Sequence, residues 1–157
     1  MRIVDNFLPN LVFNFIYDSF IDKNFAWYHQ DGKVGHDGEV QFTHIFVNDE
    51  KNLSDKISIL QPILDKLEVK KLLKAKVNLT LKEDVIRPFK YHVDLDYTNG
   101  NTAILYMNTN DGKTIFENQK EVDSLSNRIV IFGNSLKHAG TTHTNSKYRI
   151  VLNINYK

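Results

Sequence analysis

The strongest constraint on the fold is a change of pattern after Lys74, where apolar and polar residues begin to alternate with a period of two. Successive side chains of a β-strand point to opposite faces of a sheet, so this period predicts strands. Turn-forming dipeptides such as Asn99-Gly100 and Asp111-Gly112 separate the segments. The predicted strands are Ala75–Lys82, Tyr91–Asp96, Thr102–Asn108, Thr114–Glu117, Arg128–Phe132, His138–Thr142 and Tyr148–Asn155.

The first half of the chain carries helical signals instead. Apolar residues recur at helical spacing over residues 11–16. A second apolar stripe over residues 57–67 is the clearest helical stretch, and Ser54 is its candidate N-cap. Pro62 lies inside this stripe, which predicts either a kink there or a later start of the helix.

Strand and loop signals surround these two helices. The opening residues 3–8 read as a short strand, and the Gly- and Asp-rich residues 27–38 read as a loop. Phe42, His44 and Phe46 alternate as one face of a further strand.

Length and composition favour one domain. The chain has 157 residues with 3 prolines and 7 glycines, and no linker-like stretch divides it. Residues 1–74 are expected to supply helical support and substrate-side loops, and residues 75–157 the β-core. Helices followed by many short antiparallel strands predict a mainly β barrel or sandwich with the helices outside one sheet.

The composition excludes several classes of function. Without cysteine, disulfides, thiolate metal sites and cysteine nucleophiles are impossible. A net charge of +1 gives no general attraction to nucleic acid or to an anionic membrane. A local basic run comprises Lys66, Lys70, Lys71, Lys74 and Lys76. It is more typical of a solvated helix face and the residues that follow the helix than of a polyanion-binding site.

The N-terminal residues and the hydropathy predict a cytoplasmic protein. The opening MRIVDNFLPN lacks the charged and apolar regions of a signal peptide. No apolar run approaches the ~18 residues that a membrane span needs.

One constellation of residues carries chemistry. His92 and Asp94 are two apart on a predicted strand, so both side chains can reach one ion from the same face. His138, after an apolar strand, is the best third ligand. Two histidines and one carboxylate leave part of the coordination sphere open, which suits Fe(II) oxygenases better than a closed structural zinc site.

Arg149 extends this constellation. It lies eleven residues after His138 within an apolar strand, where an unpaired guanidinium is costly. A dicarboxylate would pair with it through two parallel hydrogen bonds.

This order of residues resembles the 2-oxoglutarate/Fe(II)-dependent dioxygenases, and most closely their prolyl-hydroxylase-like branch. The resemblance covers Ala75 to Tyr156, and Asp5–Pro9 also resembles the opening of such proteins. It implies a double-stranded β-helix (a jelly roll of the cupin type), Fe(II) held by His92, Asp94 and His138, and 2-oxoglutarate held by Arg149.

The resemblance also implies roles for residues near the co-substrate. Tyr106, in Ile104–Asn108, corresponds to a tyrosine near the distal carboxylate of 2-oxoglutarate, and Asn78 corresponds to a residue that contacts the co-substrate. The family's GGxTxF pattern appears here as residues 111–116, with Asp111 in place of the first glycine. Asn153 stands where a tryptophan is common, which changes the floor of the pocket.

The function implied is 2-oxoglutarate- and O₂-dependent hydroxylation of a peptidyl side chain, a free amino acid such as proline, or a small metabolite. The alternative is a cupin-like module that binds a metal or a small ligand without turnover. Arg149 separates the two, because a mere metal holder needs no guanidinium beside the ion.

Other residues have weaker claims to the site. His143 competes with His138 but lies close to Arg149, and Asp96 competes with Asp94 but lies one pleat further along. Several aromatic and histidine side chains near the N-terminal loops are candidates to line the entrance for the substrate; they are Trp27, Tyr28, His36 and His44. The competing interpretation is core packing for the aromatic residues and exposure or core packing for the histidines. Arg87 is a candidate substrate contact, and Arg128 is expected to be an exposed charge at a strand end.

Overall fold

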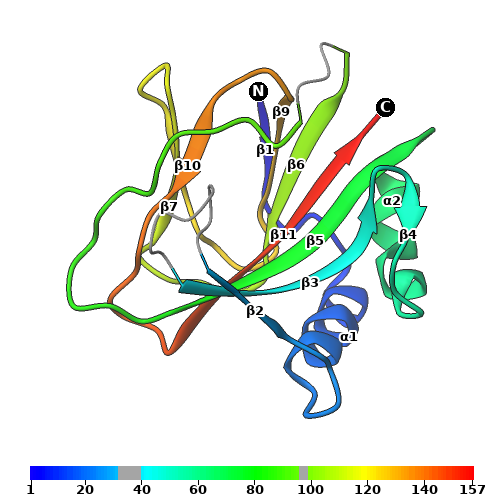
Figure 1. The fold of residues 1–157 in the computed structure, drawn as a ribbon, viewed down its shortest axis with the longest axis horizontal. Coiled ribbons are helices and arrows are strands. Elements are labelled where there is room, and N and C mark those ends of the chain that lie inside the picture. The colour runs from blue at the N-terminus through cyan, green and yellow to red at the C-terminus, as the bar shows by residue number, and fades with distance from the viewer. Residues whose placement is uncertain (32–39, 96–98) are drawn as a thin grey trace.

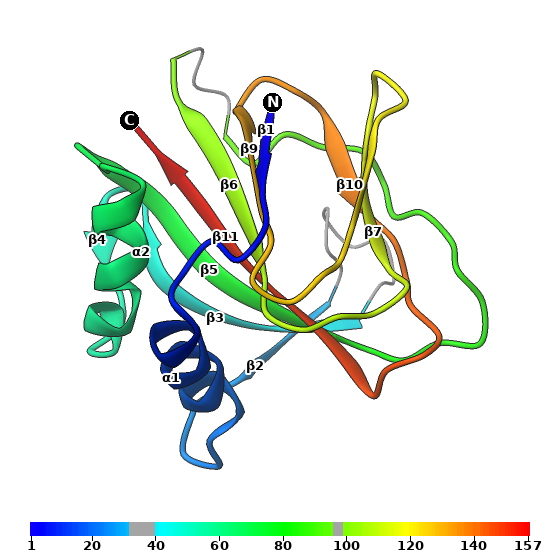
Figure 2. The ribbon, with the colours of Figure 1, turned by 180° about the vertical axis from the view of Figure 1, so that it is seen from behind.

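Two antiparallel sheets face each other, and two helices cover the outer face of the larger sheet (Figures 1 and 2). The structure is a computed structural model that describes residues 1–31, 40–95 and 99–157. His36 and Asp96 therefore lie outside the described residues.

The larger sheet, called here the major sheet, is built from both halves of the chain. Its strands lie in the order β1 (Arg2–Val4), β9 (Ile129–Gly133), β6 (Asn101–Tyr106), β11 (Tyr148–Tyr156), β5 (Leu72–Leu81), β3 (Val40–Asn48) and β2 (Tyr28–Asp31), and β4 (Lys51–Asn52) pairs with β3. The minor sheet has the order β10 (His138–Gly140), β7 (Lys113–Phe116) and β8 (Glu121–Asp123). The predicted mainly β fold with two facing sheets and N-terminal helices is confirmed.

Alternation along the central strands gives the major sheet two different faces. In β5, Ala75 and Val77 belong to the apolar core beneath the helices, whereas Lys76, Asn78 and Thr80 line a cavity on the opposite face. The neighbouring β11 alternates in the same way, because Arg149 pairs with Thr80, Val151 with Asn78 and Asn153 with Lys76. The period of two therefore separates a packing face from a polar face.

Each face has its own apolar core. The helix-side core joins Ile16 and Phe20 of α1 (Asn10–Ile21) and Ile63 of α2 (Gln61–Lys66) to the major sheet. Between the two sheets lies a smaller cluster that includes Phe116 of the minor sheet and Phe132 of the major sheet, whose ring centroids are 4.9 Å apart. This second cluster holds the sheets together at one end of the cavity.

The helices differ from the sequence-based expectation. The predicted long second helix is a 3₁₀ turn, η1 (Ile57–Leu60), followed by the short α2, and the clearest helix is α1. Pro62 occupies the first turn of α2, where its missing N–H costs nothing, so the helix starts late rather than kinks. Ser54 does not cap a helix, because its hydroxyl accepts from Lys56 N and hydrogen-bonds to His44.

Three strand predictions also need correction. Tyr28–Asp31 forms β2 rather than loop, and Glu121–Asp123 forms β8, which the sequence did not indicate. The predicted strand Tyr91–Asp96 is reduced, within its described residues, to an isolated bridge at His92. Residues 1–74 also contribute more than support, because β1, β2, β3 and β4 belong to the major sheet.

Among the described residues, every helix is too short or too polar to cross a lipid bilayer.

The packing of α1 makes a prediction about stability. Phe20 is fully buried against Phe25 and Phe46, with ring centroids 5.3 Å and 6.1 Å away. Phe20→Ala should lower the free energy of unfolding by about 3–5 kcal/mol, because it leaves a cavity beneath the sheet. Phe15→Ala, on the exposed face of the same helix, should change it by less than ~0.5 kcal/mol. Urea denaturation measures both; equal losses would contradict this packing.

Candidate metal and co-substrate site

The segment between β5 and β6 runs alongside β10 and carries two of the predicted ligands. Two backbone hydrogen bonds of 3.0 Å, His92 N to His138 O and His138 N to His92 O, join it to β10. Phe89 N donates to Gly140 O at 2.9 Å, and Thr142 N donates to Arg87 O at 3.0 Å. This segment, residues 85–94, therefore extends the minor sheet in an irregular way, and we call it the strap.

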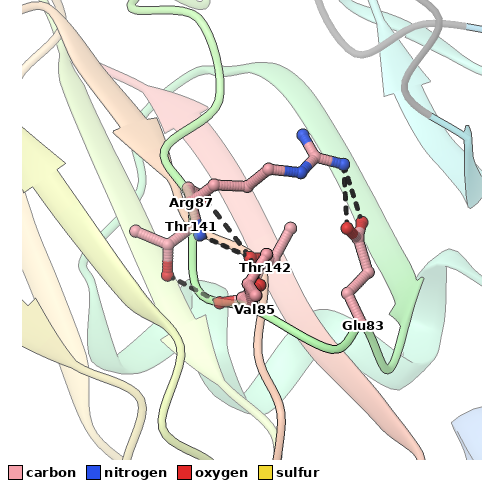
Figure 3. Close-up of polar contacts among 5 residues, drawn as sticks. All are labelled: Glu83, Val85, Arg87, Thr141 and Thr142. Carbon is pink, nitrogen blue, oxygen red and sulfur yellow. Dashed lines mark hydrogen bonds and ion pairs between the residues drawn. The ribbon is translucent and has the colours of Figure 1, made fainter.

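Figure 3 shows how the start of the strap is fixed. The Thr142 hydroxyl accepts from Arg87 N at 2.7 Å and donates to Val85 O at 2.7 Å. The Arg87 guanidinium donates to both carboxylate oxygens of Glu83, at 3.1 and 2.8 Å. Arg87 therefore has a carboxylate partner within the chain, and its contact with a substrate stays a prediction.

The strap brings the three predicted ligands together. One ligand atom from each of His92, Asp94 and His138 can be chosen so that all lie within 4.8 Å of one another. His92 Nε2 lies 3.8 Å from Asp94 Oδ1, and His138 Nε2 lies 3.4 Å from Asp94 Oδ2. The convergence predicted from separated stretches of sequence is present in the structure.

Backbone carbonyls orient both imidazoles in the same way. His92 Nδ1 lies 3.1 Å from Lys90 O, and His138 Nδ1 lies 3.3 Å from Leu136 O. A carbonyl can only accept, so each Nδ1 carries a proton, and Nε2 is the ring nitrogen on the Asp94 side that can bind a metal. This is the tautomer that a metal-binding histidine needs.

The electrostatics keep the carboxylate ionised. Burial of Asp94 by itself raises the pKa of its carboxyl group, but the hydrogen bond with His138, the charge of Lys76 and the Asn153 amide hold that pKa well below its usual range. Burial lowers the pKa of His92, although the Asp94 charge opposes the shift. A carboxylate next to a neutral imidazole is a ligand set suited to a divalent cation.

Asn153 supports the carboxylate from the floor of the cavity. Its Nδ2 donates to Asp94 Oδ2 at 2.8 Å, so it takes up one lone pair and fixes the orientation of the carboxylate. The sequence indicated an altered floor at this position. The structure adds that the asparagine acts through Asp94.

Arg149 lies buried in the same cavity. Its Nε donates to Ser124 Oγ at 2.9 Å, and its Nη2 donates to the Lys113 carbonyl at 3.3 Å. Among the described residues, no carboxylate forms an ion pair with it, and its Nη1 has no hydrogen bond. Burial lowers the pKa of this guanidinium. A buried cation of this kind is stable only if an anion or water pairs with it.

One glycine leaves room for this side chain. A Cβ at Gly112 would lie 2.9 Å from Arg149 Cδ. Gly112 is the glycine that remains of the GGxTxF-like pattern, so the structure gives that glycine a steric reason.

The two other predicted co-substrate residues occupy different positions. Asn78 lines the cavity, and its Oδ1 is buried with no hydrogen bond to the described residues. Tyr106 is fully buried, and its hydroxyl donates to Thr114 Oγ1 at 2.8 Å; Thr114 in turn lines the cavity. Burial raises the pKa of Tyr106 to about 12, so its phenol stays protonated. The Arg149 guanidinium carbon lies 5.8 Å from the centre of its ring.

Lys76 is a site residue that the sequence analysis misassigned. It lines the cavity from β5 instead of belonging to a solvated helix face. Burial lowers the pKa of Lys76, and the negative charge of Asp94 opposes this shift. The alternation with a period of two could have placed Lys76 in the cavity, because Lys76 is two residues from Asn78 and therefore lies on the same face of the strand.

The competing residues lie elsewhere. His143 is fully buried outside the triad. His44 lies in the helix-side layer and is bound through both ring nitrogens, to Ala26 O and Ser54 Oγ, each at 2.8 Å. The Trp27 indole donates to Phe20 O, and Tyr28 is largely exposed on β2. Arg128 is not the fully exposed charge expected, because it is partly buried and pairs with Asp5.

Comparisons with solved structures agree on the fold, although the sequence alone matches no known family and no curated protein. A prolyl hydroxylase from Trichoplax adhaerens, solved with a hypoxia inducible factor peptide fragment, has 13% identity and a TM-score of 0.69, over 98% of this chain and 82% of its own. The α-ketoglutarate-dependent epimerase SnoN has 13% identity and a TM-score of 0.69, over 99% of this chain and 76% of its own.

A viral collagen prolyl hydroxylase from Paramecium Bursaria Chlorella virus-1 is also similar, with 15% identity and a TM-score of 0.55, over 98% of this chain and 88% of its own. The chain therefore has the double-stranded β-helix fold of the 2-oxoglutarate/Fe(II) oxygenases, as the sequence predicted.

The contact between Asn153 and Asp94 can be tested apart from any reaction. Asn153→Ala should weaken Mn(II) binding about tenfold to a hundredfold, because a partner that orients a metal-binding carboxylate is lost. Asn155→Ala is the matched control, since that buried amide is on the same strand as Asn153 but donates to Thr102 of β6. Competition with a chromophoric chelator measures both variants; equal affinities would contradict the role of Asn153.

Proposed function

We propose that this protein is a 2-oxoglutarate- and O₂-dependent Fe(II) hydroxylase. The observation that carries the proposal is the buried Arg149, without an anionic partner among the described residues, in the same cavity as the His92, Asp94 and His138 cluster. A site that binds a metal alone needs no such cation. A co-substrate with one carboxylate at the metal and another further along the cavity does.

The ligand residues fit a divalent metal with open positions. His92 and His138 would each bind through Nε2, and Asp94 would bind through a carboxylate oxygen. Asn153 holds Asp94 on one side, and two backbone carbonyls hold the imidazoles. Three protein ligands leave room for a chelating co-substrate and for O₂.

The cavity also fits 2-oxoglutarate. Arg149 would bind the distal carboxylate, with Ser124 and the Lys113 carbonyl holding the guanidinium in place. The orphaned Asn78 Oδ1 and Thr80 Oγ1 are buried polar atoms on the same wall, and such atoms are costly without a partner. Tyr106 would act through Thr114, because its hydroxyl is bound to that side chain.

With O₂, an Fe(II) ion at these ligands would couple the oxidation of 2-oxoglutarate to succinate and CO₂ with hydroxylation of a substrate C–H bond. The chain's own contribution is to orient the ligands and to exclude water. Phe89, Ile104 and Val151 supply apolar walls to the cavity. The substrate would be a peptidyl or free amino acid, such as proline, or another small molecule.

Anaerobic titration tests the proposal without a substrate. Fe(II) followed by 2-oxoglutarate should produce a weak visible charge-transfer band, and His92→Ala should abolish it by removing a ligand. In air, with ascorbate supplying the two electrons that a substrate would otherwise provide, the loaded protein should form succinate. Tight metal binding with no band and no succinate would instead support a binding module without turnover.

The role of Arg149 makes a separate prediction. Arg149→Gln should weaken 2-oxoglutarate binding about a hundredfold and leave Mn(II) affinity nearly unchanged, because a charge-paired double hydrogen bond is lost away from the ion. Arg149→Lys should retain part of the affinity. Arg128→Gln, which removes an arginine paired with Asp5, is the control. Calorimetric titration measures the affinities; an unchanged 2-oxoglutarate affinity in Arg149→Gln would refute the assignment.

A further inference from the structure

Lys76 is a second cation in the cavity that the proposed chemistry does not use. It lines the wall beside Asn153, its partner in the β5–β11 register. Among the described residues, its ammonium group forms no hydrogen bond and no ion pair within 4.0 Å, and Asp94 acts on it only at longer range. Lys76 is half-buried, and a partly desolvated ammonium group without a partner among the described residues favours a ligand with negative charge.

Lys76 and Arg149 lie at different ends of the cavity floor. Arg149 is paired with Thr80, and Lys76 precedes Thr80 by four residues in β5, so their backbone positions are about 13 Å apart along the strands. Asn153, in the Lys76 row, contacts Asp94, so Lys76 is at the metal end of the cavity.

The charges leave Lys76 without a counter-ion when the site is loaded. Asp94, Arg149 and Lys76 are the ionised side chains among the described residues that line the cavity. The charges of a divalent metal and Arg149 cancel those of Asp94 and the 2-oxoglutarate dianion. One positive charge, that of Lys76, is left over in a poorly solvated site. A carboxylate would neutralise it, whereas a phosphate group would bring nearly two negative charges.

Resting on the function proposed above, we propose that Lys76 forms an anion subsite beside the metal position, and that the primary substrate is a small carboxylic acid, such as a free amino acid, which places its carboxylate there. An internal peptidyl residue would bring no charge to this position. Lys76 would thus select the substrate and set which C–H bond faces the metal.

Relaxation of small probes near Mn(II) tests the subsite without turnover. The protein is loaded with Mn(II) and saturating 2-oxoglutarate, and the methyl proton relaxation rates of acetate and of its neutral analogue acetamide are measured. The paramagnetic ion should speed relaxation of acetate but not of acetamide. Lys76→Met should reduce the acetate effect at least about fivefold, and Lys76→Arg should retain it.

Lys74→Met is the matched control, because it removes the same charge from the same face of β5, one pleat beyond the cavity lining. It should behave as the wild type does. Equal acetate relaxation in wild type and Lys76→Met would overturn the proposal. So would a tenfold loss of 2-oxoglutarate affinity in Lys76→Met, which would assign Lys76 to the co-substrate. If the wild type binds neither Mn(II) nor 2-oxoglutarate, the proposed function fails first and the subsite proposal fails with it.

Discussion

The paired backbone hydrogen bonds between His92 and His138 are the interaction on which the site depends. They hold the strap against β10, so that imidazoles from two distant stretches of chain meet on one side of the cavity. Asp94 then lies over the major sheet, where Asn153 can bind it. Further hydrogen bonds at Phe89 and Thr142 repeat this pairing along the strap. The cluster of candidate ligands is therefore built by sheet-like pairing, which is more rigid than a free loop.

The alternation of the major sheet explains how packing and chemistry coexist in one layer. Residues such as Val77 and Leu152 bury their side chains beneath the helices, while their neighbours Lys76 and Asn153 face the cavity. Stability thus comes mainly from one face, and the other face can hold charged groups that would destabilise an ordinary core.

Much of the fold and the ligand cluster could be predicted from the sequence because both rest on local periodicity. The alternation after Lys74 indicated the strands, and the His92–Asp94 spacing indicated a shared face. The irregular course of the strap could not be predicted from the sequence, because the pattern over Tyr91–Asp96 indicated a regular strand. Among the described residues of that range, the structure forms a bridge to β10 only at His92.

Other predictions were wrong because they depend on contacts between residues distant in the sequence. Lys76 was grouped with basic residues close in sequence, although its environment depends on which face of β5 meets the minor sheet. Arg128 was expected to be exposed, because its partner Asp5 is distant in sequence. The short β8 had no alternation long enough to detect.

The central claim is that one cavity binds a metal at His92, Asp94 and His138 and a dicarboxylate at Arg149. A crystal structure of the protein grown anaerobically with Mn(II) and 2-oxoglutarate tests it most directly. The account predicts one ion bound by both Nε2 atoms and the Asp94 carboxylate, chelated by 2-oxoglutarate, with the distal carboxylate on the Arg149 guanidinium. An ion bound elsewhere, or 2-oxoglutarate with no contact to Arg149, would contradict it.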